Sequence, residues 1–144
     1  MKINKFVATG GLIVVLALVG YFVFFYKTYP PGSIVCGSGP CIVPISIAEG
    51  CIPKPDFDPI IVEKKHGATN IFWEAPTAYT FTDPDGIKFK DNNGDVDPNP
   101  GRINGGARWH VVDNPAHTVE IHYRIEVESN GKVCTGPDPI IWNQ

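Results

Sequence analysis

The densest group of potential metal ligands is a short polar stretch that begins at Asp91. Four oxygen-bearing side chains alternate there, at Asp91, Asn93, Asp95 and Asp97. Alternating carboxylate and amide oxygens on a loop can surround a hard cation such as calcium. The stretch departs from the EF-hand loop, because it lacks the glycine at the sixth position and the glutamate at the twelfth. These four residues are therefore a candidate calcium site, and the alternative is a polar loop made of turn-forming residues.

Histidines are the second group that could bind a metal. His110 and His122 would share one face if their strands paired, and a copper or zinc site could then form. A blue-copper site also needs a cysteine ligand near a histidine, with a weak axial methionine. No histidine follows Cys134, and Met1 is the only methionine. We therefore exclude the blue-copper pattern and expect histidines that are solvated on their strands.

Motifs for catalysis are missing from the sequence. None of the four serines lies in a Gly-x-Ser-x-Gly elbow, and there is no glycine-rich phosphate-binding loop. The formal net charge is −3, whereas a protein that binds nucleic acid needs a basic patch. We expect neither an enzyme nor a nucleic-acid-binding protein, and no cofactor other than the candidate calcium ion.

The four cysteines indicate disulfides. Four cysteines allow three pairings, and the spacing favours a short local loop, Cys36–Cys41, and a long closure, Cys51–Cys134. Zinc is the rival interpretation. The spacings between the first three cysteines are poor for a zinc site, and no histidine lies near them in the sequence. We therefore predict two disulfides in an oxidising compartment.

Strands must position these side chains, because the second half of the chain alternates with a period of two. From His117 to Glu128, every second residue is apolar, as on a sheet with one buried face. Asn130-Gly131 follows, which is a strong hairpin signal. The return strand, 132–135, then carries Cys134.

Turn residues separate further short strands over the last 85 residues. We predict them at 60–64, 70–74, 79–82, 87–90, 108–112 and 140–142. Short strands without helical periodicity indicate an all-β, antiparallel β-sandwich over residues 60–144. The arrangement resembles immunoglobulin-like and fibronectin-type sandwiches in architecture, without the Cys…Trp…Cys core of antibody domains. We expect six aromatic residues in the core: Phe72, Trp73, Phe81, Phe89, Trp109 and Trp142. The long segment from Asp91 to Ala107 is either a contact surface or a flexible loop.

Residues 28–59 are rich in proline and contain three of the cysteines. Prolines at this density block helices and favour extended backbone, so we interpret the segment as a stalk. Ile42-Val43 and Ile45-Ser46-Ile47 are too apolar for a free tether. We therefore expect the segment to pack on the domain or on a partner.

An uncharged apolar run from Phe6 to Tyr26 precedes the stalk. A helix of roughly 20 residues spans the ~30 Å hydrocarbon layer of a bilayer, and only a helix satisfies the backbone of a single span. We predict a signal-anchor helix within residues 1–27. Its lipid-facing and interfacial side chains are Phe6, Leu12, Leu16, Tyr21, Phe25 and Tyr26.

The charged flanks give the orientation of this helix. Lys2 and Lys5 precede the run and only Lys27 follows it closely, so the N-terminus is expected in the cytoplasm. A cleaved signal peptide is the alternative. Its apolar core would be shorter and would end at a small-x-small site, whereas this run ends in bulky aromatic residues. We expect a bacterial inner-membrane protein with a periplasmic domain.

These observations favour a structural role over catalysis. We expect a non-catalytic accessory subunit that docks, through its helix and its outer domain, on integral subunits of a larger membrane complex. Energy-transducing complexes (photosynthetic, respiratory or monooxygenase) are the classes considered. The alternative is a membrane-tethered module that binds a ligand or a cation outside the cytoplasm. The lipid bilayer is a partner in both cases.

Overall fold

The structure is a computed structural model that describes residues 27–91 and 93–144. The apolar run from Phe6 to Tyr26 lies outside these residues, so the predicted anchor remains a prediction. In the part of the chain that is described, no helix is long and apolar enough to cross a bilayer.

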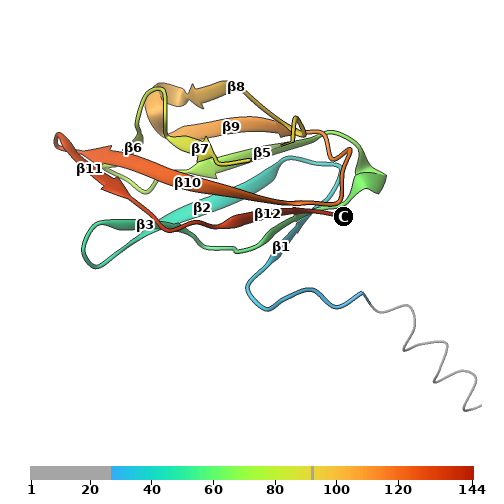
Figure 1. The fold of residues 1–144 in the computed structure, drawn as a ribbon. Coiled ribbons are helices and arrows are strands. Elements are labelled where there is room, and N and C mark those ends of the chain that lie inside the picture. Colours follow the sequence, from blue (N-terminus) through green and yellow to red (C-terminus); the bar gives the residue numbers. More distant parts are fainter. Residues whose placement is uncertain (1–26, 92) are drawn as a thin grey trace, which may run out of the picture.

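Two β-sheets form a sandwich, which confirms the all-β prediction (Figure 1). The seven strands of the first sheet are β1 (Ile34–Cys36), β4 (Ile60–Val62), β6 (Thr80–Phe81), β7 (Ile87–Phe89), β10 (Glu120–Ser129), β11 (Lys132–Thr135) and β12 (Ile140–Asn143). The five strands of the second sheet are β2 (Cys41–Ala48), β3 (Ile52–Pro55), β5 (Thr69–Glu74), β8 (Val96–Ile103) and β9 (Arg108–Asp113). Two 3-10 turns complete the elements, η1 (Lys64–His66) and η2 (Asn104–Gly106).

Both sheets are mixed, so the prediction of purely antiparallel sheets is wrong. The pairs β1–β4, β4–β12 and β2–β5 are parallel, whereas the other pairs are antiparallel. Parallel neighbours need a long crossover connection. The chain between β2 and β5 provides one, because it passes through β3 and then through β4 in the other sheet.

The segment predicted to be a stalk, 28–59, supplies three of these strands. In β2, the buried residues Cys41, Val43 and Ile45 alternate with residues that face outward. The prolines of β3 are tolerated because β3 is an edge strand. Residues 34–55 therefore belong to the sandwich itself, in line with the expectation that this segment packs on the domain or on a partner.

The core lies between the two sheets and is centred on β10. Its inward-facing residues Ile121, Tyr123, Ile125 and Val127 are fully buried, as the alternation predicts. Burying each apolar side chain of this size stabilises the fold by about 1.5–3 kcal/mol. Trp73 Nε1 donates to Tyr123 Oη at 3.2 Å across the core, so the polar atoms of both rings are paired.

The prediction for the aromatic residues holds for three that are buried and for Phe89, which packs against the core. Trp73, Trp109 and Phe81 are buried, whereas Phe72, Phe89 and Trp142 are only partly covered. Phe72 lies on the outer face of β5 and stacks on the His110 ring at 4.3 Å between centroids.

The two disulfides are the predicted pairs. Cys36–Cys41 closes the turn between β1 and β2, with 5.3 Å between the Cα atoms. Cys51–Cys134 joins the β2–β3 turn to β11, with 5.2 Å between the Cα atoms. The second bond therefore links the two sheets of the sandwich.

Candidate functional site

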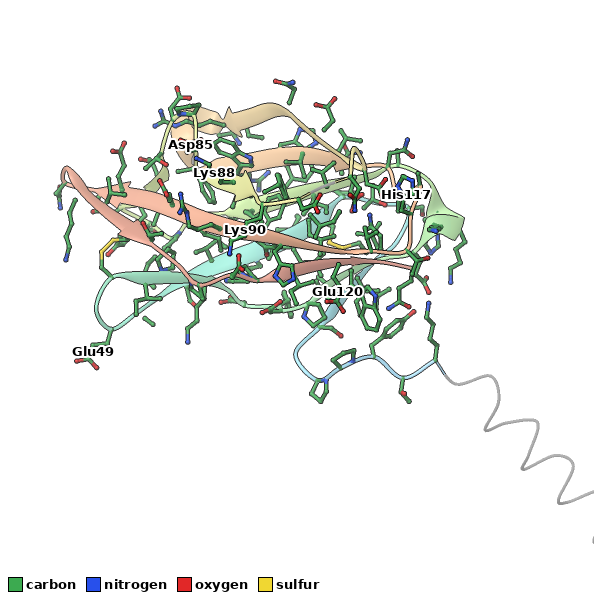
Figure 2. The ribbon with its side chains drawn as sticks, in the orientation of Figure 1. Glu49, Asp85, Lys88, Lys90, His117 and Glu120 are labelled. Carbon is green, nitrogen blue, oxygen red and sulfur yellow. A yellow bond between two sulfur atoms is a disulfide. The ribbon has the colours of Figure 1, made fainter. Side chains whose placement is uncertain are left out.

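Polar side chains gather at one end of the sandwich, which we call the N-proximal end. It comprises Lys27, η1, the β9–β10 connection and the end of β12. In Figure 1 the described chain enters here, and the C-terminus lies here as well. The opposite end, called the hairpin end, consists of the β2–β3 and β10–β11 turns. Figure 2 shows His117 at the N-proximal end and Glu49 at the hairpin end.

Three buried polar residues form the centre of the N-proximal end. Asn143 Nδ2 donates to Asp95 Oδ2 at 3.2 Å and to Asp113 Oδ1 at 3.1 Å. Asp113 and Asn143 have no solvent exposure, and Asp95 is 2% exposed. One amide therefore bridges two carboxyl groups that come from β9 and from the segment just before β8.

Asp95 also fixes the connection between β9 and β10. Its carboxylate accepts the His117 backbone N–H at 3.1 Å and contacts His117 Nδ1 at 2.7 Å. Its backbone oxygen accepts the Asn114 N–H at 2.7 Å. The His117 side chain remains 59% exposed. Asp95 therefore binds both ends of a short connection whose own side chains are mostly solvated.

The two carboxyl groups are pushed toward different protonation states. Burial raises the pKa of Asp113 to about 7, against the hydrogen bond from Asn143, and the Asp95 charge adds to the increase. Burial also acts on Asp95, but the bonds from His117 and Asn143 outweigh it and lower the pKa of this group. The pair therefore carries one proton, on Asp113, and one negative charge, on Asp95. Two buried acids can then share the Asn143 amide without two adjacent negative charges.

Two buried oxygens beside the amide bridge lack hydrogen-bond partners in the described part of the chain. Asp113 Oδ2 and Asn143 Oδ1 have no hydrogen-bond partner within the described residues. A buried acceptor without a partner costs about 1–3 kcal/mol. A proton on Asp113 Oδ2 removes a buried charge but leaves this atom without a partner among the described residues, since it becomes a donor with no acceptor in reach.

Glu63 organises the surface of the same end. It follows β4, is mostly buried, and accepts a hydrogen bond from Tyr29 Oη at 2.6 Å. Lys65 Nζ lies at 2.6 Å from its carboxylate, His66 Nε2 at 3.4 Å and Lys27 Nζ at 3.5 Å. The hydrogen bonds from Lys65 and Tyr29 lower the pKa of Glu63 to about 2, against the effect of burial.

Backbone bonds hold η1 against the last residue of the chain. Lys64 N–H donates to the Gln144 oxygen at 2.8 Å, and Gln144 N–H donates to the Val62 oxygen at 3.0 Å. Lys64 Nζ then reaches Thr118 Oγ1 at 3.0 Å. The start of the described chain, η1, the β9–β10 connection and the C-terminus are therefore connected to one another.

The Asp95–His117 pair has the form of a base with its orienting carboxylate. Acyl transfer would also require a nucleophile within hydrogen-bond reach of the ring. Across residues 27–91 and 93–144, no side-chain hydroxyl is hydrogen-bonded to the His117 ring, and every cysteine is in a disulfide. The geometry therefore fits positioning of a loop better than covalent catalysis.

The four residues of the candidate calcium site do not point to a common centre. Asp91 Oδ1 accepts the Asn93 N–H at 3.3 Å, and Asp97 Oδ1 accepts the Asn99 N–H at 3.0 Å. Asp95 is directed inward toward Asn143. No group of three or more His, Cys, Asp or Glu side chains suited to a metal occurs among the described residues. The geometry favours the polar-loop alternative.

The histidine pair considered above is separated by the fold. His110 lies on β9 and His122 on β10, and these strands belong to different sheets. His110 Nε2 contacts Asn70 Oδ1 at 2.9 Å, and burial lowers the pKa of this histidine. His122 Nδ1 lies 3.6 Å from Asp138. The assumption that the two strands pair is therefore wrong.

Glu63, Asp113 and Asn143 were not identified as site residues from the sequence. Asp113 and Asn143 are in phase with the buried positions of their strands, two residues after Val111 and Ile141. The period-two pattern could therefore have predicted that both are buried. No comparable signal marks Glu63, because its partners Lys27 and Tyr29 lie more than thirty residues away.

A separate cavity of about 470 Å³ lies between the β6–β7 segment and strands β8 and β9. Its lining includes Asp83, Asp85, Lys88, Arg102 and Trp109, and Figure 2 labels Asp85 and Lys88 on this side of the sandwich. The guanidinium of Arg102 lies 4.0 Å from Asp83. Charged groups of both signs therefore line this cavity.

Comparison of the sequence with known protein families and with curated proteins gives no match. The functional argument accordingly depends on the geometry of the two ends of the sandwich.

Proposed function

We propose that the protein is a non-catalytic accessory subunit of a larger membrane complex, held by a single N-terminal helix and docked through its β-sandwich. The observation that carries this proposal is the binding of Lys27 and Tyr29 to Glu63. The tertiary contacts of the domain thus begin immediately after the apolar run that ends at Tyr26.

A connection of this kind leaves the domain little freedom. Flexible linkers allow a tethered domain to sample a wide volume, which suits capture of a diffusing ligand. Here the side chains of Lys27 and Tyr29 are bound to the sandwich at the point where a membrane helix would end. A fixed orientation relative to the membrane suits a domain that docks on a neighbouring integral subunit.

The proposed location follows from the cysteines and the flanking charges. Two disulfides favour an oxidising compartment. With the N-terminus in the cytoplasm, as Lys2 and Lys5 favour, the sandwich lies in the periplasm of a bacterial inner membrane. Energy-transducing complexes (photosynthetic, respiratory or monooxygenase) are the classes of partner to examine first.

Several exposed apolar side chains are available for docking. Val35, Ile42, Ile52 and Val133 are each more than two-fifths exposed. Ile42 lies opposite Phe72 in the pairing of β2 with β5, beside the stack of Phe72 on His110. This outer face of the second sheet is the first candidate for contact with a partner subunit.

Gentle solubilisation of membranes that express the full chain tests the proposal. We expect the chain to co-migrate with a defined set of integral membrane proteins, and Ile42→Asp with Phe72→Asp to reduce this association. The matched control is Thr80→Asp, in the other sheet. A full chain that purifies alone from its native membrane, at physiological salt and in mild detergent, contradicts the accessory-subunit proposal.

The cavity beside Trp109 supports a second candidate function, a tethered ligand-binding module. Its mixture of Asp83, Asp85, Lys88 and Arg102 suits a small polar ligand that carries both donors and acceptors. Thermal unfolding with a panel of sugars, amino acids and calcium tests it. An increase in Tm that Arg102→Ala abolishes would favour this function over the first.

A further inference from the structure

We infer that the η1 side of the N-proximal end binds the anionic headgroups of the membrane surface. The binding face, called the basic face, consists of Lys27, Lys64, Lys65 and His66. This inference rests on the proposed membrane anchor, and it adds a partner, an anionic lipid surface, that orients the sandwich.

Covalent connection places the basic face next to the bilayer. Lys27 directly follows Tyr26, the last residue of the apolar run. Its Nζ lies 3.5 Å from Glu63, and Glu63 immediately precedes η1. A lysine side chain extends only about 6 Å from its Cα, as the usual backbone and side-chain bond lengths imply. When the run spans the membrane, η1 must therefore lie close to the headgroup layer.

The charge of this face is opposite to that of the rest of the domain. From Lys27 onward the chain has ten lysines and arginines against fifteen aspartates and glutamates. The basic face has three lysines and a single side-chain carboxylate, Glu63, which is mostly buried beneath them. An anionic surface would therefore repel most of the domain and attract this face.

The lysines of the face remain accessible to headgroups. Their ammonium groups bind Glu63 or Thr118, yet the side chains of Lys27 and Lys65 are 52% and 65% exposed. The adjoining connection, 114–118, contains no carboxylate. Asp91 precedes β8 and Asp97 lies within it, on the side of the second sheet. Glu120, at the start of β10, is the exposed carboxylate that follows this connection.

The expected strength follows from the number of lysines. Each lysine held near an anionic leaflet contributes about fivefold to the binding constant. Lys64 and Lys65 together should then favour the docked orientation by about 25-fold on an anionic bilayer. This advantage should fall at high salt, because about 0.5 M salt reduces the Debye length to roughly 4 Å.

Hydrogen exchange of the full chain in lipid nanodiscs tests the inference. The comparison is between pure phosphatidylcholine and discs with about a third of anionic phosphatidylglycerol, the headgroup charge that attracts lysine. We expect amides of residues 63–68 to exchange several-fold more slowly on the anionic discs at low salt. Amides of the hairpin end, 48–52 and 129–133, are the internal control and should exchange equally on both.

Charge reversal at the basic face sharpens this test. Lys64→Glu with Lys65→Glu should abolish the difference between the two lipids, whereas Lys54→Glu with Lys132→Glu, which changes the net charge equally at other surfaces, should preserve it. If the first variant folds poorly, the comparison of wild-type exchange on the two lipids is by itself a sufficient test. Equal exchange of residues 63–68 on the two lipids, in wild-type protein that is inserted, overturns the inference.

Insertion is measured separately, so failure of the anchor and failure of the headgroup contact can be told apart. A full chain that is extracted from membranes by alkaline carbonate contradicts the membrane anchor and, with it, the proposed function. A chain that resists extraction, but shows no lipid-dependent exchange at η1, retains the anchor and loses only the headgroup contact.

Discussion

Both ends of the sandwich carry a disulfide, but the N-proximal end adds a buried cluster of polar side chains. At the N-proximal end, Asp95, Asp113 and Asn143 join three segments through hydrogen bonds between buried side chains. At the hairpin end, the Cys51–Cys134 disulfide joins the β2–β3 turn to β11. No side-chain hydrogen bond links the two turns of the hairpin end within the described residues. The Cys36–Cys41 disulfide lies at the N-proximal end, where β1 pairs with the end of β4. Reductants should therefore act on both ends, and protons mainly on the N-proximal end.

The difference also concerns how closely the backbone packs. Near the hairpin end, a Cβ on Gly136 would lie 1.9 Å from the Pro53 oxygen, so β3 and the residue after β11 are in direct backbone contact. The N-proximal end also has backbone bonds between its segments, such as Lys64 N–H to the Gln144 oxygen, and buried polar side chains add to them. A covalent bond and close backbone contact make one end insensitive to pH, whereas ionisable groups make the other end responsive.

The largest effect is expected from breaking the hairpin end. Cys51→Ala with Cys134→Ala opens a loop of 83 residues, which should lower the free energy of unfolding by about 4.5 kcal/mol in the chain-entropy model. The matched control is Cys36→Ala with Cys41→Ala, where a separation of 5 residues predicts a loss of about 2 kcal/mol. Denaturant unfolding of both variants measures the difference. Equal losses would contradict the loop-length argument.

Removal of Asp95 breaks the N-proximal end. Asp95→Ala leaves Asn143 Nδ2 with one acceptor fewer and frees the His117 N–H. We expect a loss of about 3 kcal/mol, since buried polar groups would lose charged partners. The control is Asp97→Ala, because Asp97 lies two residues away and its side chain is exposed. This substitution should change the free energy of unfolding by less than about 0.5 kcal/mol. A similar loss in both variants would show that the buried cluster is not the cause.

Asp113 should give the N-proximal end a pH dependence. Its pKa is about 7 in the folded protein and about 3.9 unfolded, so the folded state binds the proton more tightly. The stabilising contribution is complete below pH ~4 and is lost as the pH rises through 7. Its size is on the order of 2–4 kcal/mol.

The variant Asp113→Asn tests this pH dependence. Asparagine keeps the acceptor for Asn143 and provides a permanent donor in place of the acid proton. We expect the Tm of the variant to exceed that of the wild type at pH 8 and to approach it at pH 5. Thermal unfolding at both pH values measures the effect. A variant whose Tm falls in parallel with that of the wild type would place the titrating group elsewhere.

The smallest expected effect concerns the Glu63 contact. Tyr29→Phe removes the 2.6 Å hydrogen bond to Glu63, which should cost about 1 kcal/mol. The loss should be local, so the segment before β1 should become more sensitive to protease while the unfolding midpoint of the sandwich changes little. Tyr79→Phe is the control, because the Tyr79 side chain lines a cavity at the hairpin end, far from Glu63. Protease sensitivity that is equal in both variants would argue against a tethering role for Tyr29.

The strands after Ile60 could be predicted because burial on one face imposes a period of two, as in β10. The strand β2 has the same alternation, but Pro44 lies within it, and the neighbouring prolines favour the prediction of an extended stalk. Strand β8 contains two prolines, which favour the loop predicted from Asp91 to Ala107. It is an edge strand, where a missing N–H can face solvent.

The site was less predictable than the fold because its residues resemble turn formers. Asp95 lies among Asn, Gly and Asp, and Asp113 precedes Asn-Pro, so local sequence favours exposed turns at both. Their burial results from Asn143, which enters between them on the last strand. The period-two pattern could indicate that Asp113 and Asn143 are buried. It could not indicate their contacts, because the bonded residues lie 30 and 48 positions apart.

The pairing of Gln144 with Val62 and Lys64 affects how the protein can be handled. Both backbone groups of Gln144 are hydrogen-bonded, so a tag fused after it leaves the sandwich beside Lys27, close to the proposed membrane surface. A fluorescent protein or affinity tag there would crowd the bilayer and displace η1. The exposed turn at Glu49-Gly50, at the far end in Figure 2, offers an insertion site where a label would report on the domain without disturbing its attachment.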